Sequence, residues 1–188
     1  MPQEEEPLTF RPLVVDDAIR RVLGAVARDP YPRILIDGRS GAGKTTIALR
    51  VADELDARVV SLDEFYPGWS GLATATEIAG GIVRDHRAGA LSRYRRWDWE
   101  RHAWAQHCAV EPERPLVIEG CGVLTASSAS DATASMWLDG DANARYAAAM
   151  ARDGDGFRAH WEMWARQERI HMRTHDPAGL ADIAASVC

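Results

Sequence analysis

The order of apolar and polar residues along the chain predicts strands that alternate with helices. Short apolar runs are typical of strands covered on both faces of a parallel sheet, and they occur at 33–37, 58–62, 115–118 and 134–138. Residues 181–187 fit either a last strand or a short helix. The pattern predicts an α/β fold, a doubly wound parallel sheet of about five strands with helices on both faces.

Apolar residues spaced three and four positions apart predict the helices. The predicted segments are 13–27, 44 to about 55, 99–110, 142 to about 152, and 157–172. A helix over 76–86 has a weaker signal, because Gly80 and Gly81 fall inside it. Residues 127–135 fit a loop or a short helix. Helices between successive strands are what a parallel sheet with two covered faces requires.

Composition narrows the class of protein. At 188 residues, with 46% apolar and 27% charged residues, the chain is most simply one domain, with residues 1–12 as a loose arm. The net charge of −6 argues against polymeric nucleic acid as a partner, and no apolar run is long enough to cross a membrane. Three cysteines without a C-x-x-C pair suggest reduced thiols in the cytoplasm. The sequence leaves open whether the protein is a monomer or a homodimer.

The stretch between the first predicted strand and the next helix carries a phosphate-binding motif. Residues 38–45 fit G-x-x-x-x-G-K-[ST], the P-loop, whose backbone N–H groups and helix N-terminus attract phosphate. Of the 22 basic residues only Lys44 is a lysine, so this position departs from the strong preference for arginine. The expected nucleotide-binding residues are Gly38, Arg39, Ser40, Gly41, Ala42, Gly43, Lys44, Thr45 and Thr46.

Two side chains of the P-loop carry most of its chemistry. Lys44 can reach the β- and γ-phosphates, and the Thr45 hydroxyl can ligate Mg²⁺. The motif therefore predicts ATP and Mg²⁺ as cofactors, without separating ATP from GTP. A GTPase is disfavoured, because its N-K-x-D motif would need a second lysine.

Two carboxylates follow predicted strands, at the edge where α/β sheets bind ligands. Asp63 comes after the second strand and is a candidate general base or Mg²⁺-linked carboxylate; the alternative is that it caps a turn. Glu119 comes after the third strand and could hold Mg²⁺ through water or orient the acceptor. The alternative for Glu119 is a structural partner of Lys44 or of an arginine.

An aromatic and charged segment, residues 94–101, is the candidate acceptor pocket. Two tryptophans around an aspartate, after two arginines, could bind a small molecule. The alternative is the start of a surface helix, with Asp98 as its N-cap and the tryptophans in the core. The candidate acceptor-binding residues are Asp63, Tyr66, Tyr94, Arg95, Trp97, Asp98 and Glu119.

Two helices over about 145–172 could form a short lid on the phosphates. The turn between them is rich in glycine and arginine. Arg145 and Arg152 are candidate catalytic residues that would stabilise charge on the transferred phosphoryl group. For each arginine taken alone, a surface ion pair is an equally good interpretation.

These motifs resemble those of the small P-loop kinases of the uridine kinase-like and nucleoside monophosphate kinase-like group. Residues 38–45 match the P-loop of that group closely. Residues 62–66, Leu-Asp-Glu-Phe-Tyr, are similar to its strand-end L-D-x-F-Y. Residues 117–120 are similar to its V-I-x-E-G strand, although the spacer before Glu119 is missing. The resemblance covers roughly residues 33–175.

The resemblance implies roles for individual residues. It implies that Asp63 is the base that faces the acceptor hydroxyl. Residues 94–99 resemble the Tyr and Asp-Trp segment of the acceptor site, and Arg145 with Arg152 resembles the lid pattern R-x(6)-R-D. The stretch between the second and third strands is shorter than in typical uridine kinases, so the acceptor need not be uridine.

The predicted reaction is Mg²⁺-dependent transfer of the ATP γ-phosphoryl group to a hydroxyl of a small molecule, with a nucleoside as one candidate. The nearer alternative is a nucleoside monophosphate kinase, whose phosphate acceptor could be bound by Arg93, Arg95 and Arg96. The carboxylate of Asp63 after the second strand favours a hydroxyl. Another alternative is a nucleotide-binding regulator or ATPase, for which only water accepts the phosphoryl group.

Overall fold

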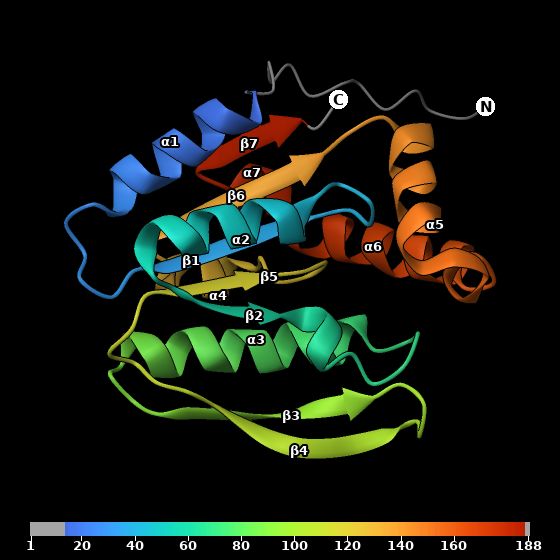
Figure 1. Ribbon diagram of the computed structural model, residues 1–188, viewed down its shortest axis with the longest axis horizontal. Coiled ribbons are helices and arrows are strands. Elements are labelled where there is room, and N and C mark those ends of the chain that lie inside the picture. The colour runs from blue at the N-terminus through green and yellow to red at the C-terminus, as the bar shows by residue number, and fades with distance from the viewer. Residues whose placement is uncertain (1–13, 187–188) are drawn as a thin grey trace.

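The protein is built on a parallel sheet of five strands (Figure 1). The computed structural model describes residues 14–186, so the predicted arm over residues 1–12 lies outside it. The strands are β1 Arg33–Gly38, β2 Arg58–Ser61, β5 Leu116–Glu119, β6 Ala134–Asp139 and β7 Ile183–Ser186. Their order in the sheet is β2-β5-β1-β6-β7. The predicted doubly wound α/β sheet of the P-loop type is confirmed.

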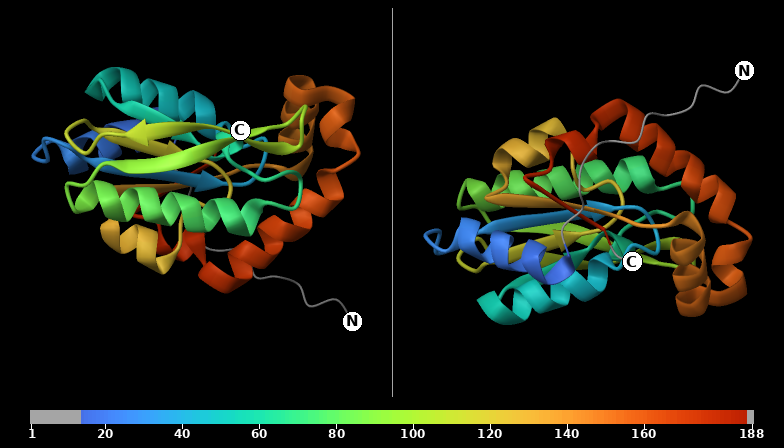
Figure 2. Two further views of the ribbon diagram at one scale, coloured as in Figure 1. Left: turned by 90° about the horizontal axis from the view of Figure 1, so that it is seen from below. Right: turned by 90° about the horizontal axis from the view of Figure 1, so that it is seen from above.

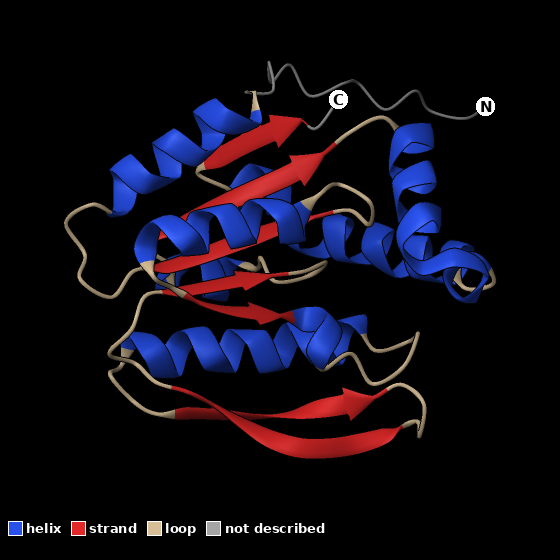
Figure 3. Ribbon diagram, in the orientation of Figure 1, coloured by secondary structure: helices blue, strands red, loops and turns tan. Residues whose placement is uncertain are grey.

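Helices cover both faces of this sheet. They are α1 Val15–Val26, α2 Lys44–Leu55, α3 Leu72–Arg87, α4 Ala126–Asp131, α5 Ala142–Arg158, α6 Trp161–His175 and α7 Pro177–Leu180, and the 3-10 turn η1 Leu62–Glu64 follows β2. Helices α1 and α2 lie on one face, and α3, α4 and α6 lie on the other (Figure 2). Figure 3 shows the same layers by type of element, with α5 standing at one end of the sheet. No helix within residues 14–186 is long and apolar enough to cross a bilayer.

Alternation along each central strand explains why the core has two halves. In β1, Ile34 and Ile36 pack with the α1 and α2 side, whereas Leu35 packs with the α3 side. Val117 and Ile118 of β5 divide in the same way. Successive strand residues point to opposite faces, and both faces are covered. These strands are therefore apolar throughout instead of alternating with polar residues.

The predicted helix over 99–110 is wrong. Residues 92–110 form an antiparallel hairpin of β3 Ser92–Asp98 and β4 Ala103–Val110, which lies beyond α3 (Figure 1). Trp97 and Trp104 are cross-strand partners whose rings meet edge to face at 5.2 Å. The Asp98 carboxylate accepts the backbone N–H groups of Glu100 and Arg101 and so closes the turn. This local hydrogen bonding and the aromatic pair favour a hairpin over a helix.

Other element bounds also differ from the prediction. Helix α3 begins at Leu72 and passes through Gly80 and Gly81, because buried Ala79 and Ile82 on the same helix pack into the core. Burial offsets the roughly 1 kcal/mol that a mid-helix glycine costs. Helix α5 continues to Arg158 across a kink at Gly154, whose φ is 63°. The C-terminal segment over 181–187, predicted as strand or helix, contains strand β7, and the short helix α7 precedes it.

Candidate active site

The P-loop connects the end of β1 to the start of α2 and places its glycines where side chains cannot fit. Gly41 and Gly43 have φ of 80° and 76°, in the left-handed region that glycine tolerates best. A Cβ at Gly41 would overlap the backbone carbonyl oxygen of Arg145. The P-loop is therefore held in one conformation, because its backbone packs against α5 at Arg145. Backbone N–H groups in such a loop form a cradle for anions.

Lys44, the first residue of α2, is nearly buried beneath this loop. Its Nζ donates to the backbone oxygens of Gly38 at 2.9 Å and Arg39 at 3.0 Å. Burial works against its charge, but the carboxylates of Glu119, Glu168 and Asp37 favour it, and the pKa of Lys44 lies above its usual value. The ammonium group therefore stays charged and is held at the loop, as a phosphate site requires.

The two residues predicted to hold the metal lie together. The hydroxyl of Thr45 donates to Oε1 of Glu119 at 3.1 Å, and the hydroxyl of Ser61, at the end of β2, donates to the same oxygen at 2.7 Å. Burial raises the pKa of Glu119, whereas the charge of Lys44 and both hydroxyls act to lower it. Carboxylate and hydroxyl oxygens are the donors that Mg²⁺ prefers. This pair fits a magnesium ion bound beside the phosphates.

Asp63 lies in the turn η1 directly after β2, with its side chain exposed. Only its backbone is engaged: the N–H donates to the Ser61 hydroxyl, and the carbonyl oxygen accepts the indole N–H of Trp99. The Asp63 carboxylate makes no hydrogen bond or ion pair with the residues that the structure describes. The backbone contacts hold its position while the carboxylate remains available to a ligand.

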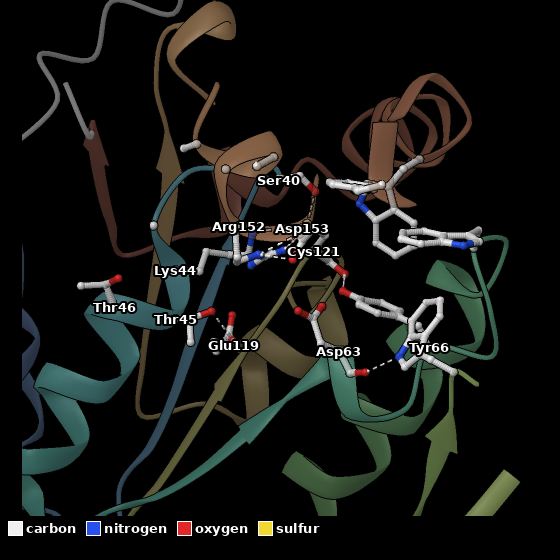
Figure 4. A pocket seen from close by; sticks show the side chains of 18 residues that line it. Ser40, Lys44, Thr45, Thr46, Asp63, Tyr66, Glu119, Cys121, Arg152 and Asp153 are labelled. Carbon is white, nitrogen blue, oxygen red and sulfur yellow. Dashed lines mark hydrogen bonds and ion pairs between the residues drawn. The ribbon is translucent and has the colours of Figure 1, made fainter. Parts of the chain in front are cut away.

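A cavity of about 320 Å³ brings these groups together (Figure 4). It is enclosed by the P-loop, the ends of β2 and β5, and residues of α5 and α6. The figure shows Thr45 facing Glu119 and the carboxylate of Asp63 on the opposite side of Glu119 from Thr45. The lining residues are Ser40, Gly41, Gly43, Lys44, Thr45, Thr46, Asp63, Tyr66, Trp69, Trp99, Glu119, Cys121, Ala148, Ala149, Arg152, Asp153, Phe157 and Trp164.

The two predicted lid arginines differ in position. Arg152 lines the cavity, and its guanidinium donates to the Asp153 carboxylate at 2.7–2.9 Å, which raises its pKa. Arg145 is buried outside the lining and donates to the backbone oxygen of Ser40 at 3.2 Å and to that of Gly140 at 3.1 Å. Its contacts support the P-loop from behind. The structure does not bring Arg145 to the cavity, so its predicted contact with the phosphates has no support in the geometry.

Four of the predicted acceptor-binding residues do not line the cavity either. The hydroxyl of buried Tyr94 donates to Glu64 at 2.7 Å. The guanidinium of Arg95 donates to backbone oxygens on β4. Trp97 packs on Trp104, and Asp98 closes the hairpin turn. These four residues stabilise the hairpin and its contact with η1. Tyr66, by contrast, is at the cavity as predicted.

Aromatic side chains that the sequence did not single out form much of the cavity wall. Trp69 follows η1, Phe157 ends α5, and Trp164 lies on α6. The sequence carries both Trp161 and Trp164 on this helix. It could not show which ring turns inward, because that depends on how α6 packs against the sheet.

Asp37 is a buried carboxylate whose importance the sequence did not reveal. It is 1% exposed, and its oxygens accept the backbone N–H groups of Gly38 at 2.6 Å, Gly122 at 3.0 Å and Leu124 at 2.8 Å. Nε2 of His171 on α6 lies 3.3 Å from the same carboxylate. Asp37 therefore ties together the P-loop, the loop after β5 and the last long helix.

Replacing Asp37 by alanine should lower the free energy of unfolding by about 3–5 kcal/mol, because three buried N–H groups lose their acceptor at about 1–3 kcal/mol each, not fully additively. Chemical denaturation measures the change. The matched control is Asp53→Ala on the exposed side of α2, which should alter stability by less than about 0.5 kcal/mol. Equal effects of the two substitutions would show that the Asp37 hydrogen bonds do not stabilise the loops.

Glu168 is a second buried carboxylate found only in the structure. It extends from α6 and accepts the backbone N–H of Ser40 at 2.7 Å, and its other oxygen pairs with Arg39 at 3.4 Å. The thiol of Cys121, in the loop after β5, donates to Glu168 at 3.4 Å and lies 3.3 Å from Nζ of Lys44. Burial raises the pKa of Cys121 to about 12. Cys121 is therefore a neutral thiol at physiological pH.

Cys121 should resist alkylation although it lies at the cavity. The thiolate is the reactive form, and a pKa of about 12 leaves very little of it at neutral pH. Half-buried Cys108 on β4 is the internal control. Iodoacetamide treatment followed by peptide mass spectrometry should modify Cys108 well before Cys121. Faster modification of Cys121 would show that its thiol is ionised or accessible in a way that this packing does not allow.

Comparison with known proteins agrees with this architecture. No protein-family model matches the chain, and neither does any curated protein. A solved structure from Bacillus stearothermophilus, provisionally named a uridine kinase, has 16% identity and a TM-score of 0.61 over 91% of this chain and 98% of its own. One from Silicibacter sp. TM1040, provisionally named a fructose transport system kinase, has 20% identity and a TM-score of 0.60 over 92% and 98%.

A third solved structure, an uncharacterised protein from Eubacterium ventriosum ATCC 27560, has 16% identity and a TM-score of 0.51 over 83% of this chain and 88% of its own. At these identities the likeness establishes the fold. The fold is shared with these solved structures, an α/β sheet of the P-loop type, as the motifs predicted.

Proposed function

We propose that the protein transfers the γ-phosphoryl group of ATP to a hydroxyl group of a small molecule bound in the cavity. The observation that carries this proposal is the placement of Asp63. Its unpaired carboxylate lines the same cavity as Lys44 and the Thr45–Glu119 pair. A base on one side of the cavity and a phosphate site on the other leave room for an acceptor between them.

The residues present fit ATP and Mg²⁺. The P-loop supplies the anion cradle and Lys44 the charge for the phosphates, while Thr45 and Glu119 supply oxygen donors for the metal. When bound, ATP supplies the phosphoryl group, and Mg²⁺ neutralises charge on its phosphates. Glu168 and Arg145 fix the loop from α6 and α5 and hold this cradle in shape before any ligand arrives.

Asp63 would act as the general base. It accepts the proton of the acceptor hydroxyl while the hydroxyl oxygen bonds to the γ-phosphorus, and the bond from that phosphorus to the β–γ bridging oxygen breaks. The products are ADP and a phosphate monoester, and Asp63 afterwards returns its proton to solvent. Lys44 stabilises negative charge on the phosphoryl oxygens, and Arg152 is close enough to the cavity to assist. Trp164 and Phe157 shield the site from water, which limits wasteful hydrolysis of ATP.

Three observations support a hydroxyl acceptor over a phosphate acceptor. Arg152 is the one arginine among the described residues that line the cavity, and it is already paired with Asp153. Arg95, one of the three arginines that could bind an acceptor phosphate in a nucleoside monophosphate kinase, donates to backbone oxygens of β4. The two named structural neighbours are provisional kinases of uridine and of a fructose transport system, and both names imply hydroxyl acceptors.

The test is formation of ADP from ATP and Mg²⁺ with panels of nucleosides, nucleoside monophosphates, sugars and aromatic alcohols, against a control without acceptor. Stimulation by a class of alcohols is the expected result. Stimulation by nucleoside monophosphates alone would favour the phosphate-acceptor alternative. A rate that no acceptor changes would favour a regulator or ATPase.

A further inference from the structure

Helix α6 contacts two separate parts of the cavity through one of its sides. Positions 164, 167, 168 and 171 are spaced three and four residues apart, so their side chains lie on the same side of the helix. Two of these side chains contact residues 37–40, at the start of the P-loop, and the other two contact the segment that follows η1. One helix therefore touches both the phosphate site and the opposite wall.

At the P-loop, α6 is held by two ionisable side chains. Glu168, which is 4% exposed, accepts the backbone N–H of Ser40 at 2.7 Å. Nε2 of His171 lies 3.3 Å from the carboxylate of Asp37, which in turn accepts the backbone N–H of Gly38 at 2.6 Å. These are contacts to the backbone of the loop itself, so a ligand that restricts the P-loop also restricts α6.

At the opposite side of the cavity, α6 holds the segment that follows η1. Nε2 of Gln167 donates to the backbone oxygen of Trp69 at 2.7 Å, and its Oε1 accepts the backbone N–H of Leu72 at 3.4 Å. The ring of Trp164 meets that of Tyr66 edge to face at 4.7 Å. Tyr66, Trp69 and Trp164 line the cavity and are called the acceptor wall below. The position of α6 therefore sets the shape of the acceptor wall.

The two sets of contacts meet at consecutive residues of α6. Gln167 holds the backbone of the acceptor wall, and Glu168 holds the backbone of the P-loop. Both lie in the middle of the 15-residue helix Trp161–His175, where backbone hydrogen bonds on either side keep a helical turn rigid. A displacement at one contact is therefore passed directly to the other.

We propose that Gln167 is a positioning residue that couples the acceptor wall to nucleotide binding at the P-loop, and this inference rests on the function proposed above. Bound phosphates restrict the P-loop, Glu168 passes that restriction to α6, and Gln167 fixes the backbone of residues 69–72. Order that the nucleotide has already imposed costs the acceptor no further entropy. Because such coupling is reciprocal, each ligand tightens the binding of the other.

Hydrogen–deuterium exchange of the whole chain, with and without Mg²⁺ and the non-hydrolysable ATP analogue adenylyl imidodiphosphate, tests this without an acceptor. We expect the analogue to slow exchange in peptides that cover residues 38–46, where it binds. In peptides that cover residues 67–72, exchange should slow by about 5-fold or more, the lower end of the range for coupled sites.

The variant Gln167→Met keeps the length of the side chain and removes both of its hydrogen bonds. The analogue should still slow exchange over 38–46 in this variant, and its effect over 67–72 should be lost. A purely structural role would instead raise exchange over 67–72 equally with and without the analogue. Gln106→Met, at an exposed position of β4 outside the cavity, is the matched control and should respond as the wild type does.

The wild type alone can overturn the inference, even if Gln167→Met fails to fold. Exchange that slows over 38–46 and stays unchanged over 67–72 would show that the P-loop and the acceptor wall are independent, and would leave the proposed function standing. A wild-type response that survives in Gln167→Met would remove Gln167 from the coupling. Unchanged exchange over both segments would contradict nucleotide binding, and with it both the proposed function and this inference.

Discussion

Replacing Asp63 by asparagine should reduce the rate of phosphoryl transfer by a factor of about 10² to 10⁴ and leave ATP binding unchanged, because a general base contributes acceleration of that order. Asparagine has nearly the same shape, and the Asp63 carboxylate makes no hydrogen bond or ion pair with the residues that the structure describes. Steady-state kinetics with a responsive acceptor give the rate, and equilibrium titration with ATP gives the affinity.

Glu64→Gln is the matched control for this substitution. Glu64 is the next residue of η1, and its carboxylate accepts the Tyr94 hydroxyl instead of lining the cavity. A glutamine oxygen can accept the same hydrogen bond, so transfer should continue at nearly the wild-type rate. Transfer that survives Asp63→Asn unchanged would remove Asp63 from the mechanism. Equal losses in both variants would indicate a general disturbance of η1.

Replacing Lys44 by alanine should weaken the binding of ATP by about 10- to 100-fold, the value of one charged hydrogen bond of about 1.5–3 kcal/mol. The transfer rate should fall as well, since the same charge faces the γ-phosphate in the transition state. Titration with a non-hydrolysable ATP analogue measures the affinity without turnover. This substitution tests the phosphate site under every functional alternative.

The control for Lys44→Ala is Arg50→Ala on the same helix. Arg50 is half exposed and pairs with Asp16 at 2.7 Å, away from the cavity. Its loss removes one positive charge from α2 without touching the P-loop, so ATP affinity should stay close to that of the wild type. If both variants bind ATP as the wild type does, the P-loop of this protein does not bind the nucleotide phosphates.

The parts of the fold with local signals could be predicted from the sequence. Helix α2 has the bounds expected for it, because the P-loop fixes its start and the apolar spacing fixes its face. The strands β1, β5 and β6 are apolar on both sides, and a continuous run of that kind is informative without any other context. Asp63 and Glu119 were placed at strand ends, and carboxyl ends of parallel strands meet at one edge of a sheet.

At the hairpin of β3 and β4, the prediction of secondary structure from the local sequence pattern was wrong. Its tryptophans and alanines can be read at helical spacing as readily as in alternation, and the choice depends on the cross-strand contact of Trp97 with Trp104. The sequence offers two interpretations of Asp98, an acceptor-binding residue and a helix N-cap. It does not reveal the turn, because an aspartate that accepts backbone N–H groups serves in caps and in turns alike. Tyr94, Arg95, Trp97 and Asp98 were predicted at the acceptor pocket from their residue types alone, and the hairpin places them away from the cavity.

Contacts between distant residues outside the motifs could not be predicted. Asp37 binds the backbone of Leu124, and Glu168 binds the backbone of Ser40, across 87 and 128 positions in sequence. Neither residue belongs to a sequence motif from which its hydrogen-bond partner could be predicted. The case of Arg145 is similar, because a motif gives its position in α5, but packing of α5 against the P-loop decides where its guanidinium lies.

The most direct test of the account follows the phosphoryl group itself. The wild-type protein is incubated with Mg²⁺ and ATP labelled with ³²P in the γ-position, together with a mixture of small alcohols, and the labelled products are separated. The account predicts label in an organic phosphate monoester, lost in Asp63→Asn. Label found in inorganic phosphate alone, at a rate that no alcohol changes, would contradict phosphoryl transfer to a bound acceptor.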